Sequence, residues 1–188
     1  MKKQIIYTAC LLIACTGLVS CSGLKSKYYV GEMLNISEGD LGLESVWLYG
    51  DDTYYLRRTG TNAFVLANMG WNQDTGDYSV KSYPLVPSQL GDHLFLNIKG
   101  PDLYTIFRVV LSDEDELVLF RVNRKKVEQD IAKGIVSAYT NEHDVVLNCT
   151  KEEQDAYILK NIDSIFSIDS ARVARKLSEK QTKEASSQ

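Results

Sequence analysis

The central part of the chain consists of short apolar or alternating runs, each ended by a few polar turn residues. The runs are rich in Tyr, Val, Leu and Phe, a composition typical of β-strands. Parallel strands need long crossovers, whereas antiparallel neighbours can be joined by turns as short as these. The pattern therefore predicts an antiparallel meander. The predicted strands are residues 28–33, 43–49, 53–59, 62–69, 77–83, 93–99, 104–111 and 116–122.

Two of these predicted strands carry apolar side chains on both faces. In residues 93–99, Leu94, Leu96 and Ile98 share one face, and Phe95 lies on the other. Residues 104–111 are also partly apolar on both sides, which favours a central strand covered on each face.

Beyond residue 122 the pattern changes to that of two helices. Asn123 can cap a helix over residues 124–133, and Gly134 is suited to end it. A second helix over residues 151–166 begins at Thr150, whose spacing to Glu153 matches a capping box. Two short strands are predicted between the helices, at residues 135–139 and 144–148.

The predicted fold is mainly β, with two helices. We expect an antiparallel meander sheet or an open barrel of about eight strands, forming a single domain over residues 28–169. Residues 170–188 are polar and lose the apolar stripe, so we predict a helical or disordered tail there.

The first twenty residues have the order of a secretory signal peptide: a basic start, an apolar middle and a small-residue end. Lys2 and Lys3 precede an apolar stretch that runs to Val19. That stretch is shorter than the about 20 apolar residues that a membrane-spanning helix needs. We therefore expect residues 1–20 to be removed.

The end of this segment resembles the lipobox of bacterial lipoproteins. Leu18-Val19-Ser20-Cys21 has the leucine, the small or apolar residues and the cysteine of that motif. The resemblance implies that Cys21 carries acyl chains such as palmitate and anchors the protein to a membrane through a tether of residues 21–27. Ser22, in place of an aspartate, favours the periplasmic side of the outer membrane of a Gram-negative cell envelope.

The charge of the chain disfavours nucleic acid as a partner. Asp and Glu number 25 against 21 Lys and Arg, and the predicted signal peptide contains lysines but no acids. Binding to nucleic acid depends on basic surfaces that neutralise phosphates. The lipid on Cys21, rather than charge, is expected to hold the protein to a membrane.

The sequence offers no convincing catalytic or metal constellation. Its two histidines are His93 and His143, and Cys149 is the one cysteine beyond Cys21. A structural zinc site needs four ligands, and a catalytic triad needs a histidine beside its nucleophile. We predict no enzyme activity, no metal and no cofactor. A carboxylate-based hydrolase is the weaker alternative; the densest acidic cluster, residues 113–116, is interpreted as a solvated turn.

Aromatic side chains gather about the hairpin predicted over residues 43–59. Strand propensity and core filling explain most such patterns, but an aromatic-lined cleft for a sugar, peptide or lipid is the functional alternative. One further tryptophan stands beside Gly70 in a predicted turn. The candidate ligand or partner contacts are Trp47, Tyr49, Tyr54, Tyr55 and Trp71.

From Glu44 to Phe166 the order of elements is similar to that of a group of uncharacterised, β-rich bacterial lipoproteins. The similarity rests on Glu44-Ser45-Val46-Trp47 leading to Asp52-Thr53-Tyr54-Tyr55-Leu56-Arg57, then Leu94-Phe95-Leu96-Asn97-Ile98-Lys99, a strand from Tyr104 to Arg108, and a helix ending near Gly134. The group implies no particular activity. The lipocalin class differs, because its early Gly-x-Trp motif is missing and Gly70-Trp71 is adjacent and late.

These observations predict a membrane-anchored envelope lipoprotein that acts as a non-enzymatic binding or structural module, with an envelope protein as its partner. The alternative is a module that binds a small hydrophobic or sugar ligand in a β-barrel cavity. That alternative requires internal space, which Phe95, Leu96, Tyr104 and Phe107 could instead fill.

Overall fold

The computed structural model describes residues 23–35, 43–50, 52–60, 63–72, 75–112 and 116–177. The predicted signal peptide, Cys21, residues 113–115 of the acidic cluster and the end of the predicted tail lie outside these residues. Within the described part of the chain, no helix is long and apolar enough to cross a membrane.

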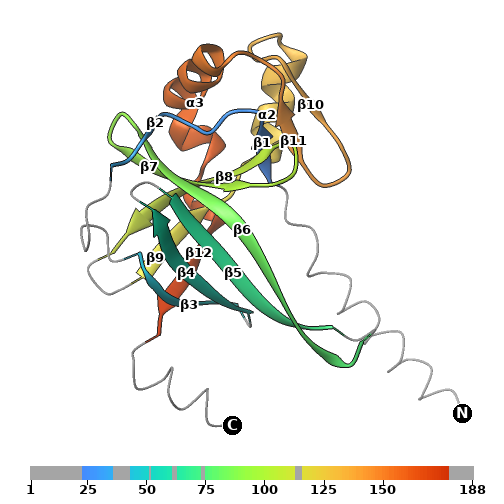
Figure 1. The fold of residues 1–188 in the computed structure, drawn as a ribbon. Coiled ribbons are helices and arrows are strands. Elements are labelled where there is room, and N and C mark those ends of the chain that lie inside the picture. Colours follow the sequence, from blue (N-terminus) through green and yellow to red (C-terminus); the bar gives the residue numbers. More distant parts are fainter. Residues whose placement is uncertain are drawn as a thin grey trace, which may run out of the picture.

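The centre of the molecule is a closed antiparallel barrel (Figure 1). In the order in which they neighbour one another, its eight strands are β3 (Ser45–Tyr49), β4 (Asp52–Gly60), β5 (Ala63–Asn72), β6 (Asp77–Leu90), β7 (His93–Lys99), β8 (Tyr104–Leu111), β9 (Glu116–Phe120) and β12 (Ala171–Lys176). β12 pairs with β3 and closes the wall. The predicted mainly β, antiparallel fold is confirmed, and the barrel is closed.

The strand that closes the barrel comes from the segment predicted as a polar tail. β12 pairs with β9 from Ala171 to Arg175. Ala174 is buried inside the barrel, whereas Arg172 and Arg175 are exposed. The prediction of a helical or disordered tail was wrong for residues 171–176. The alternation there is weak, because the buried inward position holds only a small alanine.

The segment predicted as a tether is also part of the folded domain. Leu24 and Ser26 are buried, and Lys25 between them forms an ion pair with Asp144 at 2.8 Å. The predicted tether over residues 21–27 was therefore wrong from Leu24 onward, because one buried leucine among polar residues gives little signal. The elements here are β1 (Leu24–Ser26), antiparallel to β8 and parallel to β11 (Val145–Leu147), which pairs with β10 (Ala138–Thr140).

Two other predicted strands have different bounds. The strand expected over residues 28–33 is reduced to β2 (Glu32–Met33), which pairs with β6. β6 itself continues past residue 83, through Pro84 and Pro87. Proline cannot donate to a neighbouring strand. β6 tolerates both prolines because it exchanges partners around Leu85, leaving β5 and joining β7.

Both predicted helices are confirmed, together with their caps. α2 (Arg124–Ala132) begins at Asn123, whose side chain accepts from the Lys126 amide. α3 (Lys151–Ile165) begins with the capping box between Thr150 and Glu153. A short 3₁₀ helix (Ile168–Ser170) then leads into β12.

The structure has two hydrophobic cores on opposite faces of the barrel wall. The barrel core fills the inside of the barrel. The outer core lies between α2, α3 and the outer face of the wall near β1, β7 and β8 (Figure 1). β7 supplies both, with Leu96 in the barrel core and Phe95 in the outer core, as its alternation predicted.

Candidate functional site

A cavity of about 180 Å³ lies inside the barrel. Its wall is almost wholly apolar, and each of the eight barrel strands contributes at least one side chain. The lining residues are Trp47, Tyr49, Tyr54, Leu56, Leu66, Leu85, Leu96, Ile98, Phe107, Leu117, Leu119, Arg121 and Ala174. No carboxylate is among these described lining residues, and therefore no pair of acids.

The two ends of the barrel differ. At the end where β3 and β5 begin, the interior is filled by buried side chains, including Leu43 and Phe64. At the opposite end, near the β3–β4 turn, the lining side chains Tyr49, Tyr54 and Arg121 are only half-buried. The cavity therefore has a closed floor and a mouth that solvent reaches.

Three of the five predicted contact residues lie together at this cavity. Trp47 is almost fully buried in its wall, and Tyr49 meets Tyr54 edge to face with ring centroids 6.2 Å apart. Tyr55 is not part of the cavity, because successive strand residues alternate between faces and this ring is 49% exposed on the outside.

The fifth predicted contact, Trp71, lies in β5 and not in a turn. Its backbone pairs with Tyr78 of β6, in the part of the β5–β6 hairpin that projects beyond the barrel (Figure 1). The side chain of Trp71 lies outside what the structure describes. The turn prediction was wrong because β5 continues to Asn72.

Arg121 is the one charged side chain among the described residues that line the cavity, and the sequence analysis missed it. It follows the end of β9, and its guanidinium donates to the Tyr49 hydroxyl at 2.6 Å. The same guanidinium carbon lies 6.0 Å from the centre of the Tyr49 ring. The period-two spacing of Leu117, Leu119 and Arg121 is the signal that could have placed this arginine on the inner face.

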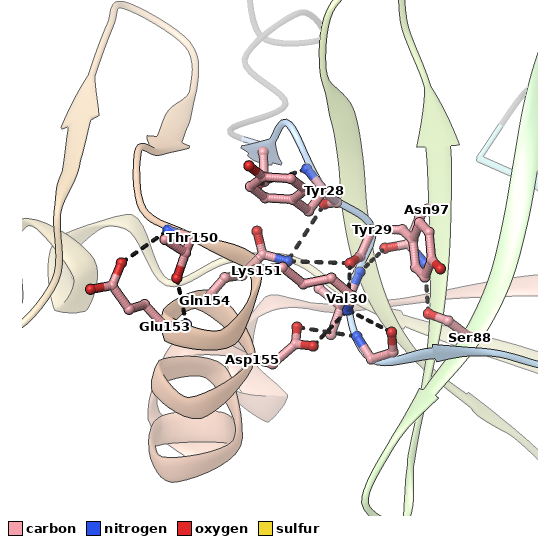
Figure 2. A network of polar contacts seen from close by, with 12 residues as sticks. Tyr28, Tyr29, Val30, Ser88, Asn97, Thr150, Lys151, Glu153, Gln154 and Asp155 are labelled. Carbon is pink, nitrogen blue, oxygen red and sulfur yellow. Dashed lines mark hydrogen bonds and ion pairs between the residues drawn. The ribbon is translucent and has the colours of Figure 1, made fainter.

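A second group of polar side chains forms a hydrogen-bond network on the outside of the barrel (Figure 2). Asn97 is fully buried, and its side chain accepts from the Val30 amide and donates to the Val86 carbonyl and the Ser88 hydroxyl. These bonds hold the segment between β1 and β2 against the wall. These three hydrogen bonds of the Asn97 side chain all go to other parts of the protein, so this network has a structural role.

The same segment is attached to α3. Lys151 donates to the Gly31 carbonyl at 2.7 Å and pairs with Asp155, which accepts from the Gly31 amide. A Cβ at Gly31 would lie 2.1 Å from the Gln89 carbonyl oxygen, so this position requires glycine. The contacts in Figure 2 thus connect α3 to the barrel through one short strap, residues 28–31.

A buried carboxylate links the two helices of the outer core. Burial alone would raise the pKa of Asp130, but hydrogen bonds from Lys126 and Tyr157 and the nearby positive charges of Lys126 and Lys133 outweigh it and lower this pKa. The Tyr157 hydroxyl donates to Asp130 at 2.9 Å, and this contact and burial raise the pKa of Tyr157. The group is enclosed by its partners and offers no space for a ligand.

The titratable side chains elsewhere in the described part of the chain do not gather into a metal site. Among the described residues, no group of three or more His, Cys, Asp or Glu side chains could hold a metal ion. Cys149 is half-buried against the outer core, and burial, with help from Glu153 and Asp155, raises the pKa of its thiol. A raised pKa disfavours the nucleophilic thiolate.

Comparisons with known proteins yield no relative: no family model, no curated protein and no solved structure matches the chain.

Proposed function

We propose that this protein is a non-enzymatic binding module of the bacterial cell envelope that holds a small apolar molecule inside its barrel. The observation that carries the proposal is the apolar cavity of about 180 Å³, closed at one end and open at the other. Pockets for small molecules are concave and mostly apolar, with a few polar groups that orient the ligand. The cavity has this composition.

The size of the cavity supports a ligand rather than a packing defect. Protein interiors contain few voids larger than a water molecule. Water that entered through the mouth would find almost no hydrogen-bond partners on the apolar wall. An apolar cavity of about 150 Å³ is large enough for benzene. A single alkyl chain of about six to eight carbons, or one aromatic ring, therefore fits.

The lipobox supports an envelope location. If Cys21 carries lipid, only Ser22 and Gly23 separate it from the buried Leu24. At about 3.5 Å per residue, the extended chain then reaches about 10 Å. The barrel would stay close to the membrane surface, where apolar molecules are concentrated. The predicted outer-membrane location, on the periplasmic side, is part of this proposal.

Native mass spectrometry of the protein, gently extracted from its own host, tests both parts. We expect an acyl mass on Cys21 and a discrete additional mass that is released on denaturation. A monomer without any added ligand would contradict the cavity proposal. A protein partner in place of the ligand would favour the interaction module, which was the first prediction from the sequence. Absence of an acyl mass would contradict the anchor.

A pair of variants on β12 locates the bound molecule. Ala174 lines the cavity, and its neighbour Val173 is exposed on the outer face. We expect Ala174→Leu to abolish the additional mass and Val173→Leu to keep it, with circular dichroism confirming the fold of each. If Ala174→Leu does not fold, Ala174→Val makes the same test with a smaller side chain. Retention of the mass by both folded variants would place the ligand elsewhere.

A further inference from the structure

Among the described residues that line the cavity, one is charged, and it lies at the mouth. Arg121 reaches the lining from the end of β9, and the Tyr49 hydroxyl holds its guanidinium. The wall below consists of leucine, isoleucine and aromatic side chains. The site therefore has one cationic end and one apolar end.

No carboxylate of the described residues forms an ion pair with Arg121. Other arginines of the structure are paired: Arg108 with Asp163, Arg124 with Glu128 and Arg175 with Glu116. Arg121 is half-buried, and its guanidinium donates to a neutral phenol. A guanidinium has five N–H donors, so donors remain that solvent or an anion can accept from. An anion at the mouth would complete its hydrogen bonding.

We infer that the ligand is a single-chain carboxylate amphiphile, with its alkyl chain in the cavity and its carboxylate on Arg121. This inference rests on the proposed function and specifies its ligand class. The planar guanidinium can donate two parallel hydrogen bonds to a carboxylate. The volume of the cavity fits a chain of about six to eight carbons.

Tyr49 strengthens the same site. Its hydroxyl oxygen accepts from Arg121, and a phenol that accepts can still donate its own proton. Its ring is in turn held by the edge-to-face contact with Tyr54. The pair of donors, one cationic and one neutral, stands at the entrance where the head group of an inserted chain would lie.

The test compares three probes with the same eight-carbon chain: octanoate, octan-1-ol and octylammonium. Trp47 lines the cavity, and Trp71→Phe leaves it as the one tryptophan of the chain, so its fluorescence reports binding. The full chain is held in lipid nanodiscs, with empty nanodiscs as the blank. We expect octanoate to bind about 10-fold or more tightly than octan-1-ol, and octylammonium to bind most weakly.

Arg121→Gln should remove the advantage of octanoate, a loss of about 10-fold or more, while octan-1-ol binding changes by less than about twofold. Arg57→Gln is the matched control, because it removes the same charge from an exposed position on the outer face of β4, next to the cavity-lining Leu56. We expect it to leave both affinities within about twofold. If Arg121→Gln does not fold, Arg121→Lys replaces it in the test. This variant keeps the positive charge but removes the planar guanidinium that donates two parallel hydrogen bonds.

The outcomes separate this inference from the proposed function. Equal binding of octanoate and octan-1-ol to the parent protein would overturn the inference and leave an apolar binding module. Equal losses of octanoate affinity in the Arg121 and Arg57 variants would also overturn it, because the overall charge of the protein would then explain the effect. Failure of both octanoate and octan-1-ol to bind would overturn the proposed function as well.

Discussion

The barrel core and the outer core share one wall but are packed in opposite ways. In the outer core, Phe95 and Phe166 meet edge to face at 5.9 Å and are almost fully buried. In the barrel core, Phe107 and Leu66 are only half-buried around a cavity of about 180 Å³. The difference shows how alternation along a strand can assign one face to stability and the other to binding.

Truncating one phenylalanine in each core tests whether the two cores contribute differently to the free energy of unfolding. Phe95→Ala should lower the free energy of unfolding by about 3–5 kcal/mol, because it empties a closed site. Phe107→Ala should lower the free energy of unfolding by only about 1–2 kcal/mol, because that ring is half-buried and already borders the cavity. Urea denaturation followed by far-UV circular dichroism measures both. Equal losses would show that the two cores contribute alike.

A second comparison is between two asparagines: Asn97, in the hydrogen-bond network outside the barrel, and Asn68 in β5. Asn97→Ala should cost about 1–3 kcal/mol, because it leaves the buried Val30 amide without an acceptor. Asn68→Ala removes one long side-chain bond of 3.4 Å to an exposed carbonyl and should cost within about 0.5 kcal/mol. The same urea titration applies. An Asn97 variant as stable as the Asn68 variant would show that the strap is not held by this side chain.

Much of the fold was predictable because its signals are local. The strands 93–99 and 104–111 have the predicted bounds, and the caps at Asn123 and Thr150 lie within one turn of the helices they start. The closure of the barrel was not predictable in the same way. It depends on β12, which pairs with strands far away in the sequence and has only Ala174 as a buried inward residue.

The site was predictable only in part. The aromatic hairpin pointed to Trp47, Tyr49 and Tyr54, but a cluster in sequence does not say which face is internal. The structure separates Tyr55 from them. Arg121 was missed although the predicted strand 116–122 includes it, because the sequence did not show which face of that strand is internal and only aromatic side chains were chosen as candidate contacts. The cavity itself arises from the packing of eight strands, and no single segment encodes its volume.

Acid should loosen the outer core before the barrel core. The folded-state pKa of Asp130 lies below its ordinary value of 3.8, so the unfolded chain binds this proton more readily. The stability that Asp130 contributes is therefore fully present above about pH 4 and is lost as the pH falls through the folded-state pKa, by at most about 1.4 kcal/mol per pH unit. The described residues that line the cavity include no carboxylate.

Hydrogen exchange of the backbone amides across this acid range can resolve the two cores. We expect the amides of α2 to lose protection on acidification, whereas those of β3 and β4 keep it, because Asp130 joins α2 to Tyr157 of α3. Asp130→Asn has no negative charge to lose, so it should flatten the pH dependence of amide exchange in α2. Equal losses of amide protection in α2 and in β3–β4 would mean that the molecule opens as one unit. An unchanged pH dependence of exchange in the Asp130 variant would assign the acid response to another group.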